Sequence, residues 1–188
     1  EHYCIDPMTR LDWEDIHHLI ETKKFFVLHA PRQTGKTTTL LAMMDVLNQS
    51  GDYTTLYINV ESAQSARGDV AEGMKRIVDS LVEGAAIRLQ DTRLREWREA
   101  VWNNSGAHGA FHGLLSRWAQ MSTKPIVLMI DEVDALVGDT LISLLRQLRE
   151  GYIGRPDVPF PQSVILCGVR DVRDYRITQG NQEVITGG

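Results

Sequence analysis

The stretch that most constrains the fold of this chain runs from His29 to Thr37, with the sequence His-Ala-Pro-Arg-Gln-Thr-Gly-Lys-Thr. It follows the apolar run Phe25-Phe26-Val27-Leu28 and precedes a helical pattern that extends from Thr38 to Leu47. A strand, a tight loop and a helix in this order allow successive backbone N–H groups and a helix N-terminus to surround a phosphate group. We therefore expect a phosphate-binding loop here.

Each position of this loop has an expected role. Lys36 is expected to neutralise the β- and γ-phosphates, and the Thr37 hydroxyl to hold Mg²⁺. Ala30 stands where such loops usually begin with glycine, at a strand end that needs no positive φ. An ordinary strand-to-helix turn is the alternative, and the flanking pattern and a downstream acidic motif favour the phosphate loop. The residues expected to bind the nucleotide are Pro31, Arg32, Gln33, Thr34, Gly35, Lys36, Thr37 and Thr38.

The acidic motif follows the apolar run from Ile126 to Ile130. Five apolar residues in a row suit a strand buried on both faces, as in a parallel sheet covered by helices. The run delivers Asp131 and Glu132 to the carboxyl end of the strand, where ligands of open α/β sheets bind. Asp131 is expected to hold the Mg²⁺ shell, and Glu132 to orient and deprotonate an attacking water. The alternative, a capped strand end, is disfavoured because the phosphate loop precedes the pair in the expected order.

A carboxylate beside the metal ligand favours phosphoryl transfer to water, which needs a positioned nucleophile and charge neutralisation. A small-molecule kinase brings its own hydroxyl acceptor and needs no acid at the position of Glu132. The long segment between the second and third strands also disfavours a kinase. The sequence therefore predicts a nucleoside-triphosphate phosphohydrolase.

The remaining pattern alternates strands and helices. Two further β-rich runs cover 54–60 and 163–169, and a loop rich in glycine and proline is expected from Gly151 to Pro161. Trp97, Trp102 and Trp118 fall at helical spacing, which favours helix packing over a stacking platform for bases. Apolar periodicity predicts helices over 11–24, 36–49, 69–89, 93–102, 111–121 and 136–148, of which those within 66–121 form a helical insertion between strands.

Three arginines are candidates for contact with the γ-phosphate. Arg170 follows the last strand and is expected to be catalytic together with Glu132 and Lys36. Its expected role is to sense the γ-phosphate, and a structural ion pair is the alternative. Arg146 and Arg149 are expected near the end of their helix, where they favour the negative end of the helix dipole. The alternative for these two is an arginine finger that reaches a neighbouring subunit.

Composition limits the remaining possibilities. The 188 residues, 43% of them hydrophobic, are enough for one medium domain, and a formal net charge of −5 does not support a surface built for nucleic acid, although it leaves room for a local basic patch. No apolar run approaches the roughly 18 residues of a membrane span. Cys4 and Cys167 fit no metal or disulfide spacing, which favours free thiols in the cytoplasm. The chain begins at Glu1 and ends on Gly187-Gly188 without a closing element, so we expect a fragment of a longer protein.

Together, the segments Ala30 to Thr37, Ile126 to Asp134 and Val164 to Arg170 resemble the additional-strand P-loop ATPases. The loop is similar to that of the AAA-like branch, which contains bacterial ATP-binding proteins related to archaeal origin-recognition and STAND ATPases. In that branch the loop often carries Pro-Arg before its Gly-Lys. The resemblance covers about residues 11 to 175. It implies a three-layer αβα sandwich in which the strand before Arg170 lies between the loop-bearing strand and the strand of Asp131. It also implies a fifth strand and a helical lid, neither of which is visible before residue 188.

The motifs and the resemblance predict one P-loop ATPase domain over 1–188, with its core at 10–175. Its expected ligands are ATP or ADP and Mg²⁺, and ATP rather than GTP follows from the resemblance alone. The predicted function is ATP hydrolysis that drives or switches a conformational change in an unidentified protein partner, with a homo-oligomer possible. The alternative is a slow nucleotide-dependent switch with little intrinsic hydrolysis.

Overall fold

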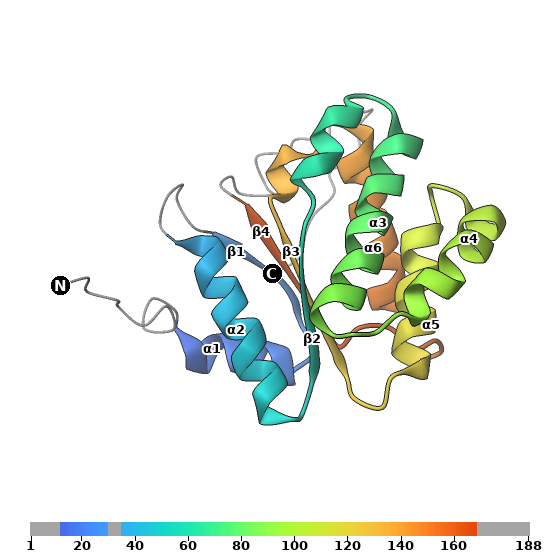
Figure 1. Ribbon diagram of the computed structural model, residues 1–188. Helices are drawn as coiled ribbons and strands as arrows, with labels where there is room; N and C mark the ends of the chain where they lie inside the picture. Colours follow the sequence, from blue (N-terminus) through green and yellow to red (C-terminus); the bar gives the residue numbers. More distant parts are fainter. Residues whose placement is uncertain (1–11, 30–34, 169–188) are drawn as a thin grey trace.

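Four parallel strands form the central layer of the computed structural model, which describes residues 12–29 and 35–168 (Figure 1). The strands are β1 (Phe25–His29), β2 (Thr54–Asn59), β3 (Ile126–Asp131) and β4 (Ser163–Gly168), and their order in the sheet is β1-β4-β3-β2. The last strand in the sequence therefore lies between β1 and β3. This order confirms the predicted additional-strand arrangement.

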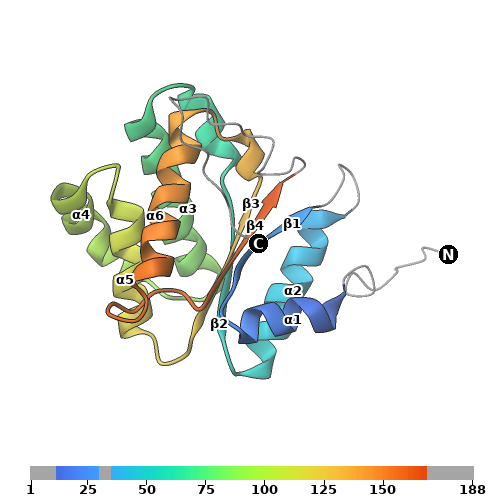
Figure 2. The ribbon, with the colours of Figure 1, turned by 180° about the vertical axis from the view of Figure 1, so that it is seen from behind.

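Helices cover both faces of the sheet. Helices α1 (Trp13–Glu21) and α2 (Lys36–Ser50) lie on one face, and α3 (Val70–Arg88) and α6 (Asp139–Gly154) lie on the other, with α4 (Arg93–Ser105) and α5 (Ala110–Met121) farther out (Figures 1 and 2). Two short 3₁₀ helices, η2 (Glu61–Ala66) and η3 (Val133–Ala135), follow β2 and β3 at their carboxyl ends. The predicted three-layer α/β sandwich is confirmed.

The apolar run of β3 explains why the sheet is central. All six residues of β3 are buried, and the side chains of its first five residues alternate between two hydrophobic clusters. Leu128 and Ile130 join the cluster beneath α3, α5 and α6, whereas Val127 and Met129 join the cluster beneath α1 and α2. Successive side chains of a strand point to opposite faces, so an unbroken apolar run is stable only with helices on both sides.

The edge strand β2 is partly closed by a side chain. The Asn48 amide donates to the Thr55 carbonyl at 2.9 Å, and its oxygen accepts from the Thr55 N–H at 2.7 Å. This pairing takes the place of a neighbouring strand at one residue of the edge. It satisfies backbone groups that would otherwise be open to another chain.

The three helices between β2 and β3 form two layers. Helix α3 packs directly on β2, and α4 and α5 pack against α3 and α6. Trp118 is fully buried and donates its indole N–H to Asp91 at 3.0 Å, while Trp97 and Trp102 pack against the same cluster. The prediction that these tryptophans are helix-packing residues is confirmed.

The structure corrects two predicted boundaries. Helix α6 begins at Asp139 rather than Leu136, because Val133–Ala135 form the 3₁₀ helix η3 and Leu136 is extended. The same helix continues to Gly154, so the loop predicted from Gly151 starts later. Gly151 is buried in the last turn, where the absence of a side chain leaves room for the ring of Phe160.

Within the described ranges, no helix combines the length and apolar character needed to cross a bilayer.

Gly151 provides a test of this packing. A Cβ at Gly151 lies 2.2 Å from the Phe160 ring, so Gly151→Ala is expected to lower the free energy of unfolding by about 1–3 kcal/mol. Gly154→Ala in the same helix meets nothing within 4 Å and is expected to change stability by less than about 1 kcal/mol, in either direction. Urea denaturation of both variants measures the difference. Equal stability would contradict the close contact between α6 and Phe160.

Candidate nucleotide-binding site

The candidate site lies at the carboxyl ends of the parallel strands. Gly35 precedes α2 with φ 75° and ψ 23°, a left-handed conformation that glycine adopts without strain. The first turn of α2 is Lys36-Thr37-Thr38-Thr39 and contains no acidic residue. The amide groups and the positive end of this helix are therefore available to an anion. Gly35 is one of the residues that the sequence predicts to bind the nucleotide, and its backbone conformation explains why the loop has glycine at this position.

Lys36 reaches across to both acidic residues that follow β3. Its ammonium nitrogen lies 3.1 Å from Asp131 Oδ1 and 3.0 Å from Glu132 Oε1. The Lys36 side chain is 10% exposed, and that of Asp131 has no exposed surface. The structure thus brings together residues that are about 95 positions apart in the sequence, as the predicted pairing of the two motifs requires.

Asp131 is held by four donors. Its Oδ1 accepts the backbone N–H of Glu132 at 2.9 Å as well as Lys36, and its Oδ2 accepts the hydroxyls of Thr37 and Tyr57, each at 3.0 Å. A buried carboxylate is stable only when its lone pairs are satisfied in this way. Glu132 adopts φ 61° and ψ 36°, a conformation that is uncommon for a residue other than glycine. This conformation places the Glu132 carboxylate on the same lysine as Asp131.

Tyr57 is a site residue that sequence reasoning missed. It lies in β2 opposite Met129, two residues before the end of the strand, and its side chain is 5% exposed. In the sequence it is one aromatic residue in a β-rich run, which indicates a core position. Only the register of β2 against β3 shows that its face of the sheet also carries Asp131. No signal in the sequence sets Tyr57 apart, because the same strand also contains Thr54, Thr55 and Asn59.

Burial and charge perturb three groups at this site. Burial by itself would lower the pKa of Lys36, but its hydrogen bonds to Glu132 and Asp131 outweigh that effect and raise the pKa above its ordinary value. Burial, and then the charge of Asp131, raise the pKa of Tyr57 to about 12. The same two causes raise the pKa of the Cys167 thiol to about 12. At neutral pH the site therefore contains a charged lysine, a protonated tyrosine and an inert thiol.

The donor set fits a phosphate group and Mg²⁺. Lys36 and the N-terminus of α2 suit phosphate oxygens, and the Thr37 hydroxyl and Asp131 carboxylate are hard oxygen ligands of the kind that Mg²⁺ prefers. In the part of the chain that the structure describes, no group of three or more His, Cys, Asp or Glu side chains could hold a metal ion. A metal at this site therefore needs phosphate oxygens and water to complete its ligand shell.

Some predicted site residues lie outside the described residues, namely Pro31, Arg32, Gln33, Thr34 and Arg170. The strand that leads to Arg170 ends beside the acidic motif, since a Cβ on Gly168 would lie 2.7 Å from Asp134 Oδ1. Arg146 and Arg149 are exposed on α6. Because α6 continues to Gly154 and has no basic residue in its last turn, the helix-dipole interpretation of these two arginines is wrong. The arginine-finger alternative stays a prediction.

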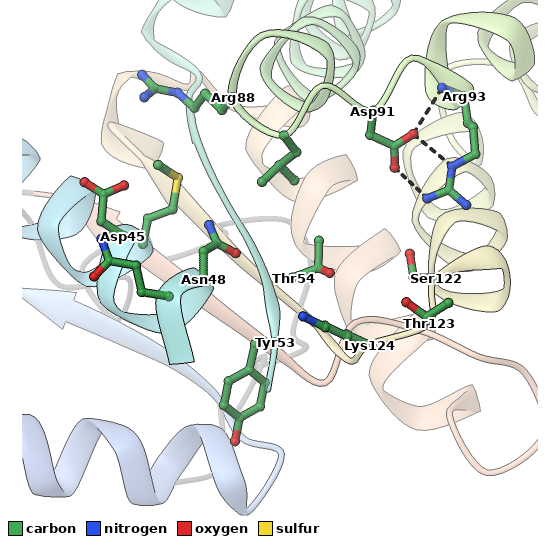
Figure 3. Close-up of a pocket in the computed structure, with 13 residues that line it drawn as sticks. Asp45, Asn48, Tyr53, Thr54, Arg88, Asp91, Arg93, Ser122, Thr123 and Lys124 are labelled. Atoms are coloured by element: carbon green, nitrogen blue, oxygen red, sulfur yellow. Dashed lines mark hydrogen bonds and ion pairs between the residues drawn. The ribbon is translucent and has the colours of Figure 1, made fainter. Parts of the chain in front are cut away.

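A separate cavity of about 560 Å³ lies at the opposite end of the sheet (Figure 3). It is bordered by the end of α2, the start of β2 and the loops before α4 and β3, and its charged residues include Asp45, Arg88 and Lys124 and the ion pair of Asp91 with Arg93. None of its 13 lining residues belongs to the group around Asp131. This cavity is therefore distinct from the candidate site.

The ion pairs of Lys36 predict a loss of stability when they are removed. Lys36→Ala leaves two carboxylates without their cation and is expected to lower the free energy of unfolding by about 1–3 kcal/mol at pH 7 without nucleotide. The contribution of Lys36 to the free energy of unfolding is fully present below the pKa of about 10.4 that lysine has in the unfolded state. It declines at higher pH, because the pKa of Lys36 is higher in the folded state. Lys75→Ala, at an exposed position of α3, is the control and is expected to be neutral. Equal denaturation curves for both variants would contradict the pairing.

The buried thiol predicts slow chemical modification. Cys167 is free and 1% exposed, and its raised pKa leaves very little thiolate at pH 8. The test uses the Cys4→Ser variant, in which Cys167 is the only thiol. A disulfide reagent is expected to label Cys167 about a thousandfold more slowly in the native protein than in the protein unfolded by guanidinium chloride. Because the pKa of Cys167 is higher in the folded than in the unfolded state, the thiol loses its proton first in the unfolded state, at a pH above about 9. The free energy of unfolding is therefore expected to fall as the pH rises beyond that value. Rapid labelling of the native protein would contradict the burial.

Comparison with known protein families matches residues 17–175 to the AAA domain. No curated protein matches the chain. The matched segment contains all four strands, the residues around Asp131 and the sequence position of Arg170. It covers most of the 188 residues and agrees with the resemblance drawn from the motifs. The chain therefore belongs to the AAA domain family of P-loop nucleotide-binding proteins.

Proposed function

We propose that this protein binds ATP with Mg²⁺ and hydrolyses it to ADP and phosphate, and that this cycle changes the conformation of the domain toward a protein partner. One observation carries the proposal: at the carboxyl end of the sheet, Lys36 contacts the carboxylates of both Asp131 and Glu132, and Thr37 donates its hydroxyl to Asp131. Family membership supports nucleotide binding. The free thiol of Cys167 agrees with the reducing cytoplasm as the compartment.

Each residue has a distinct part in the proposed mechanism. The ammonium group of Lys36 leaves the two carboxylates and binds the phosphates. The N-terminal amides of α2 and the residues from Pro31 to Thr34 bind the same phosphates. Thr37 and Asp131 hold Mg²⁺, which when bound neutralises the charge on the phosphate oxygens. Once Lys36 has left, Glu132 is free to accept a proton from the attacking water. Arg170, which follows β4 in the sequence, senses the γ-phosphate.

The same contact supports a second candidate, the slow nucleotide switch. The Glu132 carboxylate is paired with Lys36 at 3.0 Å, and a carboxylate held in this pair is not available as a base. If part of this pairing persists with ATP bound, binding and hydrolysis become separate events. In this candidate the change would pass through η2, which follows β2 and contacts both η3 and α3.

Glu132→Gln tests the role of the base. The amide keeps the shape of the side chain but cannot take a proton, so ATP hydrolysis is expected to fall by about 10²–10⁴-fold while nucleotide affinity changes little. Lys36→Ala is the matched variant in which binding itself is lost. Phosphate release and the binding of a fluorescent ATP analogue are measured side by side. Wild-type turnover in Glu132→Gln would refute the assigned role.

The two candidates differ in how they release nucleotide. Nucleotide that stays bound through purification, with negligible turnover, supports the switch. Rapid exchange with steady phosphate release supports the ATPase. If neither protein nor variant binds ATP or GTP in the presence of Mg²⁺, the proposed function fails as a whole.

A further inference from the structure

The buried hydroxyl of Tyr57 contacts the candidate metal ligand directly. It donates to Asp131 Oδ2 at 3.0 Å, the same oxygen that accepts the Thr37 hydroxyl. The tyrosine ring packs with the residues beneath α1 and α2, which a phenylalanine could do equally well. The hydroxyl therefore needs a separate explanation, because burying it stabilises the protein only through its partner.

The tyrosine ring is also enclosed by its neighbours. Its ring is 5% exposed on the α2 side of the sheet, and the guanidinium of Arg88, 5.3 Å from the ring centre, covers it at the sheet edge. Arg88 reaches this position from the end of α3, beside the cavity at the opposite end of the sheet (Figure 3). The strand and the packing on both sides set the place of the hydroxyl before any ligand arrives.

The other side-chain donors to Asp131 have roles toward the ligand. Under the proposed function, Lys36 moves to the phosphates and Thr37 gives its oxygen to Mg²⁺. The Tyr57 hydroxyl and the Glu132 backbone N–H then remain as the donors that hold the carboxylate, one on each oxygen. A carboxylate held on both oxygens cannot rotate freely, which favours binding of a metal with strict geometry such as Mg²⁺.

We propose that Tyr57 is a positioning residue for Mg²⁺, whose hydroxyl fixes the rotation of the Asp131 carboxylate. The proposal rests on the proposed function and extends it to a residue of the edge strand. It assigns Tyr57 no contact with nucleotide. Loss of the hydroxyl is therefore expected to weaken the metal site and to leave the phosphate contacts of Lys36 and α2 unchanged.

Tyr57→Phe separates these two effects, because it removes the hydroxyl and keeps the ring and its packing. Binding of a fluorescent, non-hydrolysable ATP analogue is measured in EDTA and during titration with Mg²⁺. The Mg²⁺ concentration for half-maximal tightening is expected to rise roughly tenfold, as for other residues that orient metal ligands. Affinity in EDTA is expected to match the wild type. This readout does not depend on turnover.

Tyr53→Phe is the matched control. Tyr53 directly precedes the same strand and packs against the same cluster, but it lines the cavity at the opposite end of the sheet from Asp131. Its Mg²⁺ titration is expected to match the wild type. An unchanged or lower Mg²⁺ requirement in Tyr57→Phe would overturn the proposal, and so would an equal loss of affinity with and without Mg²⁺. If the wild type itself binds no nucleotide, the proposed function fails instead, which the same titration shows.

Discussion

A carboxylate with no exposed surface lies where the two motifs of this protein meet, and the arrangement of the site depends on how it is compensated. Asp131 is satisfied by one ammonium group, two hydroxyls and one backbone amide from three separate segments of the chain. Removing a charge of this kind from water is unfavourable unless every lone pair is engaged. The helix after the loop, the edge strand and the turn after β3 are therefore tied together at one side chain.

This arrangement gives the site a defined structure through contacts between protein groups. Lys36 is charged and held by two carboxylates, so an incoming phosphate competes with protein groups rather than with water. A ligand shifts such an equilibrium by the difference in its interaction with the two states. The left-handed backbone of Glu132 belongs to the same region, because it brings the carboxylate onto the lysine. The turn that follows, η3, contacts η2 and β4, so a rearrangement here has direct neighbours to act on.

The sheet converts sequence order into spatial order at this site. β4 lies between β1 and β3, so the end of the last strand approaches the acidic motif, and Gly168 contacts Asp134. β2 lies at the edge, where Asn48 closes one residue of its backbone and Arg88 covers Tyr57. A parallel sheet of this order needs helices on both faces, and the two hydrophobic clusters supply them.

The sequence alone determined the class of fold, the strands, and the pairing of Lys36 and Thr37 with Asp131 and Glu132, because strong local patterns mark loops, buried strands and strand ends. It could not determine where α6 ends, since its last turn is extended by packing of Gly151 against Phe160, a contact between segments with no shared periodicity. Nor could it identify the residue that shares Asp131 with Thr37. Strand register decides that Tyr57 faces the carboxylate, and register is fixed by tertiary packing of both sheet faces, not by the residues of one strand.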